Sequence, residues 1–112
     1  MSSAEIVFLE RQTSLIAKIS SEIDHHNAAR LRESIDSKLF YLRPKQLILD
    51  FSSVEFMDSS GLALILGRAE VAAAIGASVR LVGMSERYKR LVSLAGLERI
   101  KNLTISASEG EV

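Results

Sequence analysis

The sequence predicts one α/β domain over residues 1–112, with a mixed β-sheet flanked by α-helices. The length of 112 residues matches one compact domain. Two apolar segments near the amino terminus, separated by the polar "RQTS", predict a hairpin. After the hairpin, short apolar segments alternate with segments of helical periodicity, and this alternation is typical of strands joined by right-handed crossovers.

The first half of the chain contains the hairpin, one helix and one central strand. The hairpin strands are expected at residues 6–9 and 14–20. Asp24 precedes a helix with one buried face, because its apolar residues recur at helical spacing: Ala28, Leu31, Ile35, Leu39 and Leu42. Pro44, the only proline, separates this helix from "QLILDF". That segment is short and apolar, which indicates a strand buried on both faces.

The second half predicts two helices and two strands. A helix over residues 59–75 ends at Gly76, and the strand "SVRLVG" follows it. Ser85 caps the helix "ERYKRLVSLA", and Gly96 ends that helix. "RIKNLTIS" is the expected last strand, and the final "SEGEV" is expected to be loose.

Composition narrows the classes of function. Fourteen basic residues balance fourteen acidic ones, which argues against nucleic acid as a partner, because phosphate binding needs a clustered cationic excess. The absence of cysteine excludes disulfides and thiol chemistry. The amino terminus lacks a signal-peptide pattern, and no apolar stretch is long enough to cross a membrane. We expect a soluble cytoplasmic protein without a membrane partner.

The helix over residues 59–75 carries two apolar stripes. One stripe is expected in the core: Leu62, Ile65, Leu66, Ala69, Ala72 and Ala73. The second stripe is rotated to another face: Leu64, Arg68, Val71 and Ile75. Either a neighbouring helix covers it, or it is exposed and binds a partner. Arg68 favours the partner surface, because a guanidinium suits a mixed interface better than a core.

The stretch "FMDSSGLALILGRAE", residues 56–70, raises the question of a catalytic or anion-binding serine. A serine nucleophile needs a base, and the only histidines, His25 and His26, lie in a different segment. The stretch also lacks the first glycine of G-x-S-x-G. A phosphate cradle is disfavoured because the chain has no P-loop pattern and Asp58 would repel a bound phosphate.

A regulatory phosphate is the third interpretation of this stretch. A phosphoserine in the first helical turn is tolerated beside the positive end of the helix dipole, whereas an interface over the same turn would be disrupted. Gly61 fits close approach of another protein, because it has no Cβ. The residues alone equally allow a simple helix start capped by Asp58 or Ser59.

The run Asp24-His25-His26 also invites a metal hypothesis. Two histidines in the whole chain are too few for the ligand set of a metal phosphoesterase, so we predict no metal site. The simpler interpretation is that Asp24 caps a helix whose first turn carries two surface histidines.

Three segments together resemble the anti-sigma factor antagonists of the STAS domain family: "EIDHHNAARLRESI", "LILDFSSVEFMDSSGLALILGR" and "YKRLVSLAGL". The resemblance covers nearly the whole chain, and "DHH" favours the sporulation members of the family. It implies a STAS-type mixed sheet flanked by helices and a protein that is not an enzyme and needs no cofactor of its own.

The resemblance also implies function by partner switching. The unphosphorylated antagonist binds an anti-sigma factor that is a serine kinase, and this releases the sigma factor. The kinase then uses ATP to phosphorylate the antagonist, and a serine phosphatase restores it. Motif matching places the phosphoacceptor at Ser59. The implied partner-binding residues are Asp24, His25, Asp58, Ser60, Gly61, Leu62, Leu64 and Arg68.

Two positions depart from the family pattern. Ser21 stands where the family usually has glycine, and Ala63 replaces the common glycine after Gly61-Leu62. The methyl group of Ala63 lies near the expected contact and bears on which partner binds. Two alternatives stay open: a STAS interaction module of another signalling or transport system without phospho-switching, and, less favoured, a small-ligand or nucleotide-binding domain.

Overall fold

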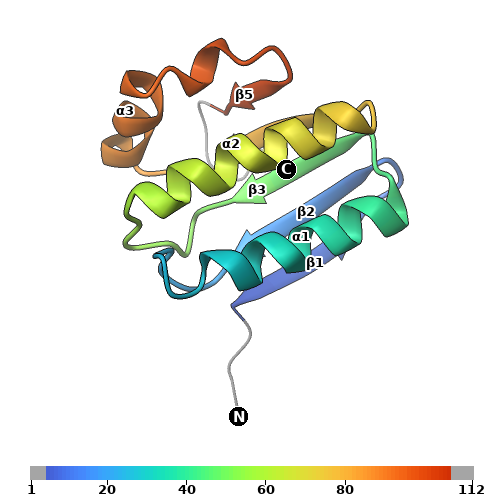
Figure 1. Ribbon diagram of the computed structural model, residues 1–112, viewed down its shortest axis with the longest axis horizontal. Helices are drawn as coiled ribbons and strands as arrows, with labels where there is room; N and C mark the ends of the chain where they lie inside the picture. The colour runs from blue at the N-terminus through green and yellow to red at the C-terminus, as the bar shows by residue number, and fades with distance from the viewer. Residues whose placement is uncertain (1–4, 107–112) are drawn as a thin grey trace.

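The computed structural model of the protein describes residues 5–106 and consists of a five-stranded sheet with its helices (Figure 1). The strands are β1 (Ile6–Glu10), β2 (Ser14–Ile19), β3 (Gln46–Asp50), β4 (Ser78–Val82) and β5 (Leu103–Ile105). The helices are α1 (Ala28–Leu42), α2 (Ser59–Ala74), α3 (Glu86–Leu94) and a short 3₁₀ turn, η1 (Leu97–Arg99). The predicted α/β class with a mixed sheet is confirmed.

The strands lie side by side in chain order, β1-β2-β3-β4-β5. β1 and β2 form the predicted antiparallel hairpin, with Phe8 opposite Ala17, and the other neighbours are parallel. β3 is the central strand, and its Leu47, Ile48 and Leu49 are all buried, as its continuous apolar sequence predicted.

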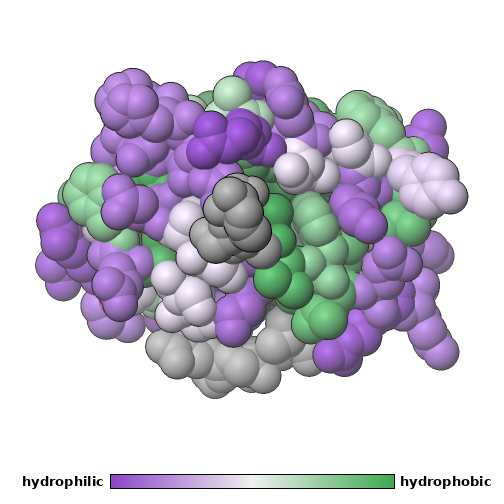
Figure 2. Space-filling model, turned by 90° about the horizontal axis from the view of Figure 1, so that it is seen from below, coloured by the Kyte–Doolittle hydropathy of each residue, from purple (hydrophilic) through white to green (hydrophobic). Residues whose placement is uncertain are grey.

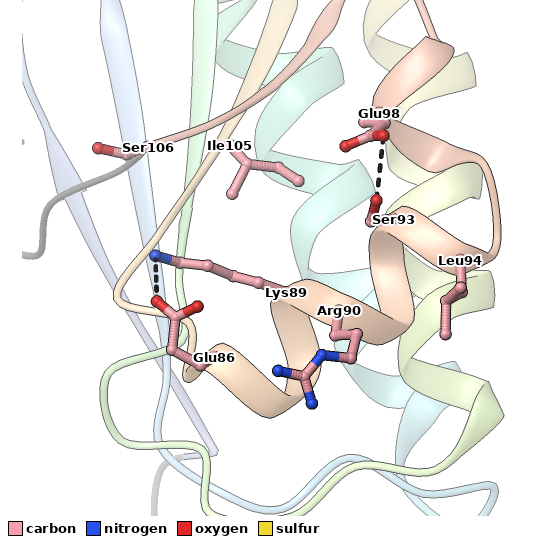
Figure 3. Close-up of a pocket in the computed structure, with 8 residues that line it drawn as sticks. All are labelled: Glu86, Lys89, Arg90, Ser93, Leu94, Glu98, Ile105 and Ser106. Atoms are coloured by element: carbon pink, nitrogen blue, oxygen red, sulfur yellow. Dashed lines mark hydrogen bonds and ion pairs between the residues drawn. The ribbon is translucent and has the colours of Figure 1, made fainter.

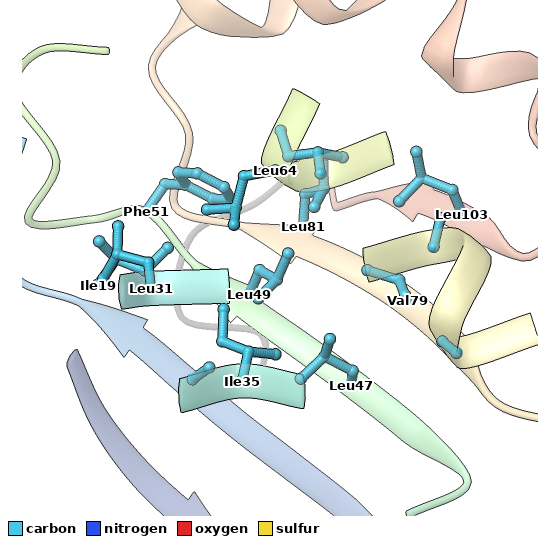
Figure 4. Close-up of a cluster of buried hydrophobic side chains, with 14 of the residues drawn as sticks. Ile19, Leu31, Ile35, Leu47, Leu49, Phe51, Leu64, Val79, Leu81 and Leu103 are labelled. Carbon is cyan, nitrogen blue, oxygen red and sulfur yellow. The ribbon is translucent and has the colours of Figure 1, made fainter. Parts of the chain in front are cut away.

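Helices α1 and α2 lie side by side across one face of the sheet, and α3 lies beyond α2 toward β5 (Figure 1). The main core fills the space between these helices and the sheet (Figure 4). α1 contributes its predicted apolar face through Leu31, Ile35 and Leu39. This packing fixes the amino-terminal end of α2 beside the loop that joins β2 to α1.

Most predicted element ends are close to those observed. The Ser85 side chain accepts a hydrogen bond from the Tyr88 N–H, and Gly76 and Gly96 have positive φ after their helices, which favours glycine. The last strand is shorter than predicted, because η1 and a turn occupy the first part of "RIKNLTIS". The predicted loose segment "SEGEV" lies outside the described residues.

Candidate functional site

The site is built around the start of α2, where the predicted phosphoacceptor lies. Ser59 is the first residue of α2 and is exposed. Asp58 is the N-cap: its Oδ1 accepts a hydrogen bond from the Ser60 N–H at 2.7 Å. Within residues 5–106, the Ser59 hydroxyl makes no hydrogen bond of its own. The two serines are therefore distinct, since Ser60 is half-buried and its amide is part of the cap.

The loop between β2 and α1 is fixed beside this helix start. Ile23 and Met57 form an isolated parallel bridge. The Ile23 N–H donates to the Phe56 carbonyl at 3.0 Å, and the Asp58 N–H donates to the Ile23 carbonyl at 3.1 Å. Asp24 and Asp58 each follow a residue of the bridge, so the structure brings these two predicted partner-binding residues into neighbouring loops.

Asp24 organises a turn rather than capping the helix directly. Its Oδ1 accepts hydrogen bonds from the N–H groups of His26, at 2.9 Å, and Asn27, at 3.2 Å. These bonds lower the pKa of the Asp24 carboxyl, and the bond from His26 has the largest effect. The prediction that Asp24 caps a helix beginning at His25 is wrong, because residues 25–27 form this turn and α1 begins at Ala28. His25 and His26 are exposed, as predicted.

Asn27 holds the loop together and was not predicted. It is buried, and its amide nitrogen donates to the Glu22 carbonyl at 2.7 Å and to Ser21 Oγ at 3.2 Å. Its Oδ1 accepts from the Asp24 N–H at 3.0 Å. Burial of an asparagine depends on distant segments, so the local sequence gives no signal for it beyond its place before a helix.

Gly61 serves a contact inside the molecule. A Cβ at this position would lie 2.6 Å from the Met57 sulfur, and the residue is buried. The expectation that Gly61 admits the backbone of another protein is therefore wrong for this conformation, in which Met57 occupies the space.

The loop that precedes α2 is also held by Tyr88 of α3. The Tyr88 hydroxyl accepts a hydrogen bond from the Met57 N–H at 3.1 Å. Sequence reasoning missed this role of Tyr88.

The second stripe of α2 is covered by α1, so the expectation that Leu64 and Arg68 form an exposed surface is wrong. Leu64 points into the core beside Phe51 (Figure 4) and is 3% exposed. Arg68 is 4% exposed and forms an ion pair with Asp36 of α1, Nε to Oδ1 at 2.7 Å and Nη2 to Oδ2 at 3.1 Å. Burial lowers the pKa of Arg68, and Asp36 opposes that shift.

The other α2 residues divide differently from the prediction. Ile65, Ala69 and Ala72 are buried as expected, and Leu62 is half-buried. Leu66, expected in the core, is 40% exposed, and Ala73 is exposed as well. Because α1 lies beside α2 on the same face of the sheet, α2 buries the side that faces α1 as well as the side that faces the sheet. The apolar spacing within α2 alone does not reveal this.

A groove of about 310 Å³ runs between α1 and α2, next to the site. Its walls are His25, Ala28, Ala29 and Arg32 on one side and Ser60, Ala63, Leu64 and Arg68 on the other. Leu64 and Arg68 line this groove although both side chains are almost fully buried. Ala63, the departure from the family pattern, is exposed on its wall.

A hollow of about 490 Å³ between α3 and β5 contains none of the predicted residues, and its Lys89 and Ser93 are bonded to Glu86 and Glu98 (Figure 3). Among residues 5–106, no three His, Asp or Glu side chains are grouped to hold a metal. No helix in the described part is long and apolar enough to span a membrane.

Comparison with known proteins identifies a family and several relatives of this chain. The STAS domain model matches residues 5–112. An anti-sigma F factor antagonist of Paenibacillus polymyxa is 31% identical over 86 residues, which cover 77% of this chain and 74% of the relative. An anti-sigma-B factor antagonist of Bacillus subtilis is 32% identical over 105 residues, which cover 92% of each chain.

Solved structures share the fold. SpoIIAA, an anti-sigma factor antagonist, matches in its unphosphorylated form with a TM-score of 0.71 and 22% identity, covering 92% of this chain and 89% of that one. The phosphorylated form of the Bacillus SpoIIAA matches with a TM-score of 0.70 and 23% identity, covering 91% of each chain. The sequence matches and the shared fold agree with the predicted family: this chain belongs to the anti-sigma factor antagonists of the STAS domain family.

Proposed function

We propose that this protein is a phosphorylation-switched antagonist of a kinase-type anti-sigma factor. Unphosphorylated, it binds the anti-sigma factor and releases the sigma factor. Phosphorylation of Ser59 by that kinase, with ATP, ends the binding, and a serine phosphatase restores it. The protein is then the substrate of phosphoryl transfer and not its catalyst, and it acts in the cytoplasm with its partners.

The observation that carries this proposal is the position of Ser59. Its side chain is exposed at the first turn of α2, while the adjacent Asp58 side chain is bonded to the Ser60 N–H. A phosphate on Ser59 could project outward without displacing any core side chain. The positive end of the α2 dipole would partly compensate its charge.

The same position explains how one phosphate could abolish binding. If the partner covers the start of α2, a phosphate carrying about −1.5 to −2 charge would be buried without a counter-ion, or would hold the partner away. Burying an unpaired charge costs several kcal/mol, and each ~1.4 kcal/mol is a tenfold loss of affinity. The switch therefore needs no change of fold.

The proposed docking surface comprises the exposed parts of both loops and the groove. Asp24, His25, Asp58 and Ser60 form its rim, and Leu62 contributes where it is half-buried. Gly61, Leu64 and Arg68 are buried: Gly61 leaves room for the Met57 side chain, and the other two line the groove. We expect substitutions of these three to act on the shape of the surface more than through direct contact.

Control of sporulation is the finer part of the proposal. It is supported by the run Asp24-His25-His26 and by the similarity to the Paenibacillus polymyxa anti-sigma F factor antagonist. The similarity to the Bacillus subtilis anti-sigma-B factor antagonist is comparable. Binding should therefore be measured against anti-sigma factors of both classes, and tighter binding to the sporulation class is expected.

The direct test is to incubate the protein with its kinase-type anti-sigma factor and ATP and to map the modified residue by mass spectrometry. We expect phosphate on Ser59, none in Ser59→Ala, and phosphate still on Ser59 in the neighbouring variant Ser60→Ala. Ser59→Asp should fail to bind. Stable binding of the anti-sigma factor without any modification of Ser59 would instead indicate a STAS interaction module that lacks the phospho-switch.

A further inference from the structure

Strand β1 forms one edge of the sheet and has an apolar sequence. β1 pairs with β2 alone among the described strands. Its first four residues, Ile-Val-Phe-Leu, contain neither a charge nor a proline, two of the usual devices that protect an edge from pairing. Val7 is 45% and Leu9 is 48% exposed. Seen from this side of the molecule, apolar side chains gather near the centre of the surface (Figure 2).

The hydrogen bonds of the hairpin show which backbone groups of β1 point outward. The Ser20 N–H donates to the Glu5 carbonyl, and the Arg11 N–H donates to the Ser14 carbonyl. In the observed antiparallel register, residues 5, 7, 9 and 11 therefore direct their backbone groups toward β2. Ile6, Phe8 and Glu10 direct theirs to the free edge, where they can pair with another strand.

We propose that β1 binds β1 of a second copy of this chain, antiparallel and with the two-fold axis at Phe8. Phe8 then pairs with Phe8 of the second copy. Ile6 of each copy pairs with Glu10 of the other, one such pair at each end of the strand. Because these are the residues with outward backbone groups, this register uses all of them. The two sheets join into one continuous sheet.

The side chains fit the same register. Val7 lies opposite Leu9 of the second copy in a non-hydrogen-bonded pair, the type in which side chains approach most closely, so both exposed apolar residues become covered. Glu5, which precedes the strand, already has Arg30 of α1 as an ion-pair partner at 3.0 Å. Glu10, the one charge within the strand, already has Lys38 of α1 as an ion-pair partner at 3.6 Å.

Helix α1 supplies a second contact beside this axis. An open groove of about 600 Å³ lies where α1 meets β1, and it is lined by Phe8, Ser34, Ser37, Lys38 and Tyr41. Tyr41 is 86% exposed, although it is aromatic. In the proposed dimer the two grooves meet across the paired Phe8 residues, and the small Ser34 and Ser37 side chains leave room for the two α1 helices to approach.

The dimer is independent of the phosphorylation proposal. α2 packs on the sheet at β4, whereas the proposed interface is at β1, at the edge of the strand order. Both Ser59 sites therefore stay accessible, and one dimer can present two docking surfaces.

The mass of the full chain in solution is the first test. Light scattering from micromolar to millimolar concentration should show the mass rising from 12.3 kDa toward twice that value. The double substitution Val7→Lys/Leu9→Lys places lysines opposite each other and should weaken the dimer about tenfold or more. The control Leu94→Lys changes an apolar residue that is 78% exposed on α3 and should leave the dimer intact. A monomer at every concentration, or a dimer broken by Leu94→Lys alone, overturns the proposal.

Amide hydrogen exchange of the unaltered protein tests the register without relying on a variant that folds. Raising the concentration should slow exchange at Ile6, Phe8 and Glu10, whose N–H groups become bonded in the dimer. Val7 and Leu9 should not change, because their N–H groups face β2 at all concentrations. Slowing at Val7 and Leu9 instead, or at none of the five, contradicts pairing through β1.

Discussion

Asp58 combines two features that can be tested separately: it caps α2, and it places a negative charge beside Ser59, the proposed phosphoacceptor. Asp58→Ala removes the acceptor for the Ser60 N–H and should cost about 1 kcal/mol of unfolding free energy, measured by urea denaturation. Asp58→Asn keeps an acceptor and should stay within a few tenths of a kcal/mol of the unaltered protein.

The kinase distinguishes the charge from the cap. If the carboxylate marks Ser59 for the kinase, both Asp58→Ala and Asp58→Asn should be phosphorylated more slowly, although only the first is destabilised. An unaltered rate of phosphorylation in Asp58→Asn would show that the kinase does not recognise the Asp58 charge.

Gly61 is constrained by Met57 rather than by the helix. Alanine is a better helix former than glycine by about 1 kcal/mol, yet Gly61→Ala should destabilise the protein by about 1 kcal/mol or more, because its Cβ would overlap the Met57 sulfur. In a Met57→Ala background the same change should be neutral or stabilising. The unfolding free energies of the four proteins form a double-mutant cycle, and equal effects in both backgrounds would exclude this contact as the cause.

Glu5 links stability to acid pH. A hydrogen bond from Arg30 lowers the pKa of Glu5 in the folded protein, and the Asp24 carboxyl also has a lowered pKa. A carboxyl with a lowered folded-state pKa contributes stability above its unfolded pKa and loses it as the pH falls through the folded pKa. The urea midpoint should therefore fall as the pH drops below about 5, where unfolded carboxyls begin to bind protons. Glu5→Gln should flatten that dependence, and an unchanged slope would contradict the assignment.

The residues that the sequence did not reveal are those whose roles depend on distant partners. Asn27, Tyr88 and Asp36 each bond to a group that another segment brings close. Ser59 and Asp58, in contrast, belong to one local motif, and both lie at the start of α2 as predicted. Local chemistry is readable in a sequence, whereas burial of a polar side chain depends on the packing of elements.

The contact between α1 and α2 includes an ion pair in which Arg68 is buried and Asp36 is partly exposed. Asp36→Ala leaves the Arg68 guanidinium, 5% exposed in its side chain, without a counter-ion and should cost about 3 kcal/mol. Adding Arg68→Met removes the stranded charge and should recover most of that loss. Urea denaturation of both variants measures the free energy of unfolding. If the double variant is as unstable as Asp36→Ala, the unpaired Arg68 charge is not the cause of the lost stability.

The helices and strands were predictable where the pattern was local. The hairpin, the central strand and the start of α2 follow from apolar spacing and from polar or capping residues at their ends. The rotation of α2 was not predictable, because Leu64 is buried and Leu66 exposed only when α1 lies alongside. The short last strand shows the same limit, since η1 ends at Arg99 and a further turn takes up residues 100–102 of the expected strand.

The whole molecule places its two proposed surfaces apart, with the phospho-switch at the start of α2 and the pairing edge at β1. The core lies between them and links α1, α2 and α3 to the sheet. A phosphate on Ser59 should therefore leave the dimer unaffected, and disruption of β1 should leave phosphorylation unaffected.

One phosphate on Ser59 is proposed to control binding of the anti-sigma factor. Titration calorimetry of the fully phosphorylated protein and of the unmodified protein, against the same anti-sigma factor with bound nucleotide, measures this control. We predict that phosphorylation weakens binding by about a hundredfold or more, the equivalent of ~2.7 kcal/mol. Equal affinity of the two forms would contradict the switch.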